Sequence, residues 1–129
     1  MAEIAGQRFR VLPGQFAVCR LERNSAWPSW ARGSFVSMTA TEDELSVVCA
    51  ADAPPATVTA ERDWSVLKIV GPFAFTTVGV LASLAAPLAQ AGVSLLAIAT
   101  YDTDYLLVKT DSLEKAITTL IAAGHARIE

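Results

Sequence analysis

The sequence predicts an α+β fold in which two helices cover one face of an antiparallel sheet, the ferredoxin-like arrangement β-α-β-β-α-β. Three observations in residues 64–129 predict it. Two segments carry apolar residues at helical spacing, and each ends at a glycine. Apolar runs of strand length precede, separate and follow these segments. The elements therefore alternate in the order that defines this fold.

The first strand and helix of this pattern lie between residues 64 and 92. Residues 64–71, WSVLKIVG, read as the strand. Thr76 or Thr77 can cap the helix by accepting a hydrogen bond from its free N–H groups. Pro87 removes one backbone bond and is expected to bend or loosen the last turn, and Gly92 is expected to end the helix. The apolar residues at helical spacing are Leu81, Leu84, Ala85 and Leu88.

Two more strands are expected at 93–99, VSLLAIA, and 104–109, DYLLVK. The first is apolar on both faces, whereas a sheet with helices on one face normally has polar side chains on the other. Both faces must therefore be covered, by a larger sheet, by the first half of the chain or by a second copy. Asp111 is expected to cap the second helix with Glu114 as its reciprocal partner, and residues 125–129 form a last short strand. The apolar stripe of the second helix is Leu113, Ala116, Ile117, Leu120 and Ile121, with Gly124 after it.

The first half of the chain reads as strands with little helix. The expected elements are a short strand before a Pro-Gly turn at 13–14, strands near 15–21, 34–39 and 45–50, and a proline-containing linker at 52–61. Trp27 and Trp30 in the stretch WPSW are open to two interpretations. They form either an exposed aromatic contact or, as we prefer, a plug over the end of the first sheet where a helix is missing.

Composition excludes several classes of protein. The 129 residues are 53% hydrophobic and 18% charged, which is typical of a folded domain and not of a disordered chain. With a net charge of −3 and no run of Lys and Arg, nucleic-acid binding is not expected. The N-terminus has no signal-peptide pattern, and no apolar stretch is long enough to span a bilayer. We expect a soluble, cytoplasmic protein that binds neither nucleic acid nor membrane.

The cysteines and the single histidine do not suggest a reactive centre. Cys19 and Cys49 lie in apolar runs without metal-binding spacing, so we interpret them as small buried residues, although a disulfide between them is geometrically possible. His125 has no nucleophile near it in sequence, and a structural role is preferred over a catalytic one. No metal site and no cofactor are expected.

Residues 71–120 resemble the second unit of the small tandem ACT-domain proteins of bacteria. They are also similar to the ACT repeats of the CASTOR-type arginine sensor and to the regulatory domains of aspartate kinases. Residues 33–52, GSFVSMTATEDELSVVCAAD, resemble the corresponding segment of the family's first unit. The resemblance implies two ferredoxin-like units with antiparallel sheets: residues 1–60, with degenerate helices, and residues 61–129.

The resemblance also implies a binding site. ACT modules bind small amino acids at the interface between two units, on the loop before the first helix, with a strand of the partner closing over the ligand. Here that loop is residues 71–79. Free N–H groups at a helix N-terminus suit the ligand's carboxylate. The implied carboxylate contacts are Thr76, Thr77, Gly79 and Val80, and the implied contacts to its other polar groups are Thr100, Tyr101 and Asp104.

Two residues depart from the pattern of the arginine sensor. Ala74 stands where that pattern has glycine, and Thr77 stands where it has an acid that holds a cationic side chain. A neutral or smaller amino acid is therefore expected in preference to arginine.

The two aspartates of the hairpin 97–109 are interpreted differently. Asp102 reads as a solvated turn residue. Asp104 shares a strand face with Leu106, so it should point toward covered surface, where its carboxylate serves either a ligand or a backbone group. Tyr101 and Tyr105 are interpreted first as core or interface residues.

Together these observations predict a non-enzymatic, regulatory amino-acid-binding module that forms a homodimer through sheet edges or helix faces. The alternative is a protein-interaction or oligomerisation module that has lost its ligand. An enzyme is not expected, because no acid–base pair or activated nucleophile can be assembled from these residues.

Overall fold

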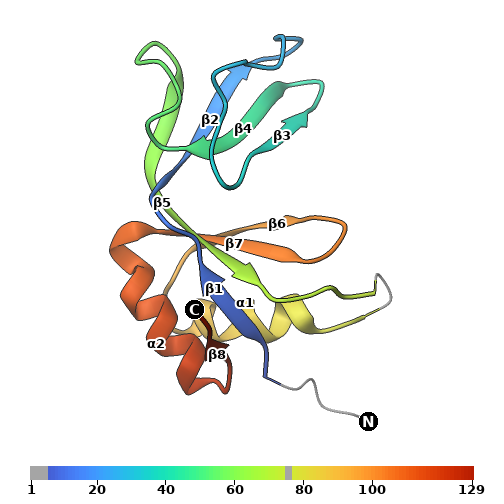
Figure 1. The fold of residues 1–129 in the computed structure, drawn as a ribbon, viewed down its shortest axis with the longest axis vertical. Helices are drawn as coiled ribbons and strands as arrows, with labels where there is room; N and C mark the ends of the chain where they lie inside the picture. The colour runs from blue at the N-terminus through green and yellow to red at the C-terminus, as the bar shows by residue number, and fades with distance from the viewer. Residues whose placement is uncertain (1–5, 75–76) are drawn as a thin grey trace. The chain divides into compact units, whose positions relative to one another are not determined.

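The computed structural model describes residues 6–74 and 77–129. They form two compact units: an N-terminal unit of residues 13–64, and a C-terminal unit of residues 6–12 together with 65–129 (Figure 1). Strand β5 (Thr59–Ile69) passes from the first unit into the second. Residues 6–12, which the sequence grouped with the first half of the chain, therefore lie with the second half.

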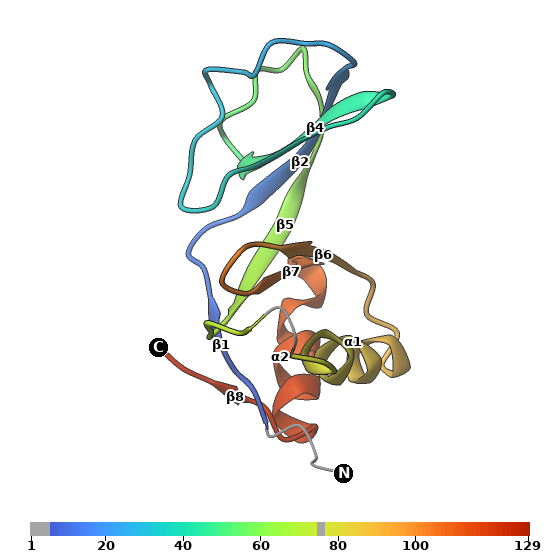
Figure 2. The ribbon, with the colours of Figure 1, turned by 90° about the vertical axis from the view of Figure 1, so that its right-hand side faces the viewer.

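The C-terminal unit has the predicted α+β, ferredoxin-like architecture. Its strands lie in the order β8-β1-β5-β7-β6, and both helices lie on the same side of this sheet (Figure 2). Besides the end of β5, its elements are β1 (Arg8–Val11), α1 (Val80–Gln90), β6 (Leu95–Ala99), β7 (Asp104–Lys109), the 3₁₀ turn η1 (Thr110–Ser112), α2 (Leu113–Ala122) and β8 (Ala126–Arg127).

Strand β1 lies between β5 and β8, the first and last strands of the predicted β-α-β-β-α-β pattern. It pairs with β5 in antiparallel register, Phe9 opposite Ile69, and with β8 in parallel, Arg8 opposite Ala126. The pair of β6 and β7 is also antiparallel. Phe9 is fully buried in the core beneath the helices. The N-terminal strand therefore completes the sheet of the C-terminal unit.

Both helices bury narrower faces than the sequence predicted. In α1 the buried residues are Val80, Leu84 and Leu88, whereas Leu81 is 39% exposed. In α2 they are Ala116, Ile117 and Leu120, whereas Ile121 is 51% exposed. The helices rest on the sheet through one side only, so apolar residues at the margins of each stripe face outward.

The predicted caps are wrong for both helices. The N-cap of α1 is Gly79, at φ 85°, with no side-chain hydrogen bond, so Thr77 does not cap it; Thr76 lies outside the described residues. A 3₁₀ turn precedes α2, whose N-cap is Ser112, again without a side-chain bond. Asp111, the predicted N-cap, lies inside that turn, one residue before the observed N-cap.

A buried histidine compensates for the proline within α1. Pro87 has no N–H to donate to the carbonyl of Ser83, four residues earlier. His125 Nε2 lies 2.9 Å from that carbonyl oxygen, and the N–H of Gln7 donates to His125 Nδ1 at 2.9 Å. Because Nδ1 accepts, the proton is on Nε2 and is donated to Ser83. The expected structural role of His125 is thereby confirmed. The last turn of α1 stays closed, with the Ala91 N–H donating to the Pro87 carbonyl at 3.0 Å.

Strand β6 forms the edge of the C-terminal sheet. In the described part of the chain it pairs only with β7. Ala97 and Ala99 are exposed, and Leu96 is 40% exposed. The apolar faces of this strand are thus not fully covered within the chain.

The N-terminal unit is a four-stranded antiparallel sheet in the order β3-β4-β2-β5, with β2 (Phe16–Glu22), β3 (Ser37–Ala40) and β4 (Glu44–Ala50). Residues 13–64, all of which the structure describes, contain no helix. Trp30 packs against the core of this sheet, as the plug interpretation predicts, but Trp27 is 66% exposed. Strand β3 begins at Ser37, three residues later than expected, and β5 already begins at Thr59 within the expected linker.

Cys19 and Cys49 are neighbouring free thiols in the core of this unit, 2% and 0% exposed. Burial, with Cys49 alongside, raises the pKa of the Cys19 thiol to about 12, and burial also raises the pKa of Cys49. Thiolate is the reactive form of cysteine, so both side chains should be inert while the protein is folded.

The free energy of unfolding is therefore expected to fall as the pH rises from about 9 toward 12. In the unfolded chain a thiol loses its proton near its ordinary pKa of about 8.5. Folded Cys19 keeps its proton up to about pH 12, so alkali favours unfolding. Urea unfolding between pH 8 and 11 would measure the loss. Cys19→Val with Cys49→Val should flatten the slope; an unchanged slope would contradict the assignment.

Candidate ligand-binding site

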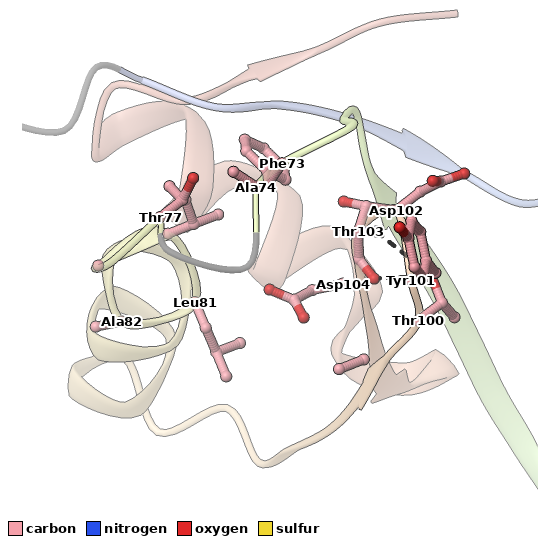
Figure 3. Close-up of a pocket in the computed structure, with 13 residues that line it drawn as sticks. Phe73, Ala74, Thr77, Leu81, Ala82, Thr100, Tyr101, Asp102, Thr103 and Asp104 are labelled. Carbon is pink, nitrogen blue, oxygen red and sulfur yellow. Dashed lines mark hydrogen bonds between the residues drawn. The ribbon is translucent and has the colours of Figure 1, made fainter.

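A cavity of about 250 Å³ opens in the C-terminal unit between the loop before α1, the first turn of α1 and the hairpin that joins β6 to β7 (Figure 3). Its described lining residues are Phe73, Ala74, Thr77, Gly79, Val80, Leu81, Ala82, Ala99, Thr100, Tyr101, Asp102, Thr103 and Asp104.

Two threonines hold the hairpin tip in shape. The N–H and the hydroxyl of Thr100 both donate to the Thr103 carbonyl oxygen, at 2.8 and 2.9 Å. The hydroxyl of Thr103 is buried and donates to the carbonyl of Ile69 at 2.8 Å. The tip is thus fixed to itself and to β5. The Thr100 hydroxyl proton is already used, so this side chain can offer a ligand only its lone pairs.

The loop before α1 is clamped onto this hairpin. The N–H of Phe73 donates to the Asp102 carbonyl at 2.9 Å. A Cβ atom on Gly71 would lie 2.9 Å from the same oxygen, which is closer than real Cβ atoms approach backbone. Glycine at 71 therefore lets the loop approach the hairpin closely enough to form one wall of the cavity.

The first turn of α1 lines the cavity and carries backbone N–H groups that have no acceptor within the helix. The Ser83 N–H donates to the Gly79 carbonyl at 2.9 Å, whereas the N–H groups of residues 80–82 have no acceptor within the helix. The first turn contains no acidic residue, and Gly79 provides no side-chain cap. The partial positive charge of the helix N-terminus is therefore not neutralised by its own sequence, as binding of an anion requires.

Asp104 brings a carboxylate to the same cavity. It is the first residue of β7, half-buried, and pairs with Ala99 of β6. Its side chain points into the cavity from the sheet side (Figure 3). Among the described residues, no hydrogen bond or ion pair engages this carboxylate. The face assigned to Asp104 by alternation with Leu106 is confirmed, since Leu106 and Val108, but not Leu107, belong to the core beneath the helices.

The structure brings together all but one of the residues that the family resemblance implied. Thr77, Gly79, Val80, Thr100, Tyr101 and Asp104 line the cavity, and Thr76 lies outside the described residues. Tyr101 is 80% exposed, so it does not lie in the core, and its alternative role at an interface stays a prediction. Asp102 is exposed, as expected of a turn residue, and also lines the cavity.

Sequence reasoning missed several lining residues. Leu81 and Ala82 lie in the first turn of α1, so the predicted start of this helix could have indicated them. Phe73, Ala99 and Thr103 come from two loops whose approach depends on the clamp between Phe73 and Asp102, and no local pattern indicates that clamp.

The cavity has opposite electrostatic ends and apolar walls. The helix N-terminus lies on one side, and Asp104 and Asp102 lie on the other, while Phe73, Leu81 and alanine side chains form the walls. No Lys, Arg or His occurs among its described lining residues. The arrangement suits a small zwitterion.

Two other kinds of feature were not found in the described ranges. No three His, Cys, Asp or Glu side chains are placed to hold a metal ion, and neither α-helix is long and apolar enough to cross a membrane.

Comparison with known proteins identifies the class. Residues 59–122 match the family model described as the ACT domain, and residues 14–57 match a second model described as an N-terminal domain. Residues 59–122 are thus similar to the ACT domain. The crystal structure of protein Atu0741 from Agobacterium tumefaciens is 39% identical, with a TM-score of 0.91, and the match covers 97% of this chain and 94% of that one. The chain belongs to the same family as Atu0741.

More distant structures share the fold. A Vibrio cholerae protein, VC0802, described as of unknown function and a possible transport protein, is 20% identical over 93% of this chain and 91% of its own, with a TM-score of 0.76. The regulatory subunit of aspartate kinase from Thermus flavus is 10% identical over 93% of this chain and 99% of its own, with a TM-score of 0.65. No protein of curated function matches the chain.

Proposed function

We propose that this protein is a non-enzymatic regulatory module that binds a small neutral amino acid in the cavity between α1 and the 100–104 hairpin. The observation that carries the proposal is the unneutralised N-terminus of α1 facing an Asp104 carboxylate with no partner among the described residues. The ligand's carboxylate would accept hydrogen bonds from the first turn of α1, and its ammonium group would pair with Asp104.

The cavity walls favour a neutral ligand side chain. Phe73, Leu81 and Ala99 offer apolar surface, and the described lining residues provide no cation to neutralise an acidic side chain. With Thr77 in place of an acid, little would hold a guanidinium once Asp104 pairs with the ammonium group. The ACT match and the likeness to a regulatory subunit support a regulatory role.

We propose that the protein is a cytoplasmic homodimer and that the complete site lies at an interface between the ACT units of two copies. The N-terminal unit would be the degenerate first unit of a tandem. The cavity is open, and Tyr101 at its rim is 80% exposed. Strand β6, which leads into the hairpin, is an uncovered apolar edge with Leu96 40% exposed. Such edges pair readily with another strand, and a second copy would close the cavity.

The amino-acid proposal predicts a ligand-dependent rise in thermal stability. Differential scanning fluorimetry against the twenty amino acids should find at least one small neutral amino acid that raises Tm, because a ligand at a hundred times its Kd adds about 2.7 kcal/mol. Isothermal titration should then give an affinity that Asp104→Asn lowers about tenfold or more. Asp111→Asn, which removes the same charge from an exposed residue outside the cavity lining, is the matched control and should change the affinity less. No response to any amino acid at millimolar concentration would refute the proposal.

The alternative is a protein-interaction or oligomerisation module without a ligand. The exposed apolar edge of β6 favours it, because this surface needs a partner whether or not the cavity is filled. It predicts no amino-acid response and a stable complex in size-exclusion chromatography that a charge on the edge, Ile98→Lys, disrupts.

A further inference from the structure

A cluster of cations lies on the sheet face opposite α1 and α2. Along β1, Phe9 points into the core beneath the helices, so Arg8 and Arg10 point to the other face. In β5 the same alternation places Leu67 and Ile69 in the core and Lys68 on the other face. These cations come from segments about sixty residues apart, so no linear motif indicates them.

Two of these cations are direct neighbours. Arg10 and Lys68 are register partners in the antiparallel pair of β1 and β5. Like charges directly opposite each other destabilise a sheet. Within the described residues, Lys68 forms no ion pair, whereas Arg10 Nη1 donates to a main-chain carboxylate oxygen of Glu129, the last residue of the sequence, and keeps its other donors. The chain as a whole carries a net charge of −3, so the positive charge of this surface is opposite in sign to the net charge of the protein.

The two side chains lie at a cavity distinct in position from the first. It measures about 340 Å³ and is lined by Arg10, Lys68, Gly71, Thr100 and Tyr105, among others. Asp102 also lines it. The lining is rich in polar groups. A ligand here meets two cations together and one carboxylate, so it needs a doubly negative group and a part that tolerates Asp102, such as a hydroxyl.

We propose that this cavity binds a small dianion, a hydroxylated phosphate monoester, through Arg10 and Lys68. The planar guanidinium offers two parallel donors to phosphate oxygens, and the ammonium adds a point charge from the neighbouring strand. A bound phosphate dianion relieves the repulsion between the two cations. The two cavities share Thr100, Asp102 and Thr103, but neither Arg10 nor Lys68 lines the first, so substitutions at these cations test the second cavity alone.

The test is an NMR titration of the full-length, ¹⁵N-labelled protein at pH 8 and constant ionic strength. The probes are inorganic phosphate, glycerol 3-phosphate and, as a dianion without phosphorus, succinate. Amide signals near Arg10, Lys68 and Gly71 should shift and saturate with the phosphates, with a Kd below about 10 mM. Glycerol 3-phosphate should bind more tightly than inorganic phosphate.

A charge-matched pair of variants locates the site. Arg10→Gln with Lys68→Gln should weaken phosphate binding about tenfold or more. Lys115→Gln with Arg127→Gln removes the same charge from α2 and β8 and should leave the Kd within about twofold. If Arg10→Gln with Lys68→Gln perturbs folding, each single substitution should still weaken binding. Absence of saturable shifts, saturation by succinate alone, or equal weakening by both pairs would overturn the proposal.

Discussion

Replacing Phe9 with alanine is expected to lower the free energy of unfolding by about 3–5 kcal/mol, the usual cost of deleting a fully buried aromatic side chain. Phe9 is 0% exposed and belongs to the core formed by β5, β7 and the two helices. It is contributed by β1, which lies between β5 and β8. The loss should therefore appear in the C-terminal unit, although residue 9 lies at the other end of the chain.

Chemical unfolding would measure this loss, and hydrogen exchange would locate it. Amides of α2 and β8 should exchange faster in Phe9→Ala, whereas those of β3 and β4 in the N-terminal unit should change less. Phe9→Leu keeps most of the buried volume and should cost less than half as much. If Phe9→Ala lowered the free energy of unfolding by less than about 1 kcal/mol, well below the usual cost for a core residue, β1 would not be an integral strand of this unit.

The second large effect is expected at His125. His125→Ala should destabilise the protein by about 2–4 kcal/mol, because it removes the imidazole from two part-buried backbone groups, each of which loses a hydrogen bond at a cost of about 1–3 kcal/mol. These are the N–H of Gln7 and the carbonyl of Ser83, each 2.9 Å from the imidazole. Urea unfolding would measure the change. Arg127→Ala, an exposed substitution two residues away, should cost less than about 0.5 kcal/mol.

A double-mutant cycle with Pro87 tests the physical reason for this effect. In Pro87→Ala, the new backbone N–H can donate to the Ser83 carbonyl, which then no longer depends on His125. The cost of His125→Ala in that background should fall by about 1 kcal/mol, the usual net value of one hydrogen bond. Strict additivity of the two substitutions would show that His125 does not compensate for the proline.

Local pattern was sufficient for most elements of the C-terminal unit. The spacing of Leu84 and Leu88 with the glycine at 92 predicts α1, and the apolar runs predict β6 and β7, all within a few residues of the observed bounds. Periodicity also places Asp104 on the inward face of β7. These features depend on neighbours in the sequence, which is why the sequence predicts them.

The helix N-caps and the edges of the buried helix faces were less predictable. Asp111 and Glu114 satisfy the sequence pattern of a capping box, yet a 3₁₀ turn occupies that position. Leu81 and Ile121 satisfy the helical spacing, yet both are exposed. In each case several local conformations are nearly equal in free energy, so packing against the sheet decides between them.

The sequence by itself determined the α+β class and the order of helices and strands in the second half, and the family resemblance pointed to the two loops that line the first cavity. Only the tertiary structure decided that β1 completes the C-terminal sheet, that His125 serves the carbonyl left free by Pro87, and that Arg10 lies beside Lys68. The reason is the distance along the chain. Gln7 and His125 are 118 residues apart, and such partners are chosen by the sheet as it assembles, after local preferences have already been met.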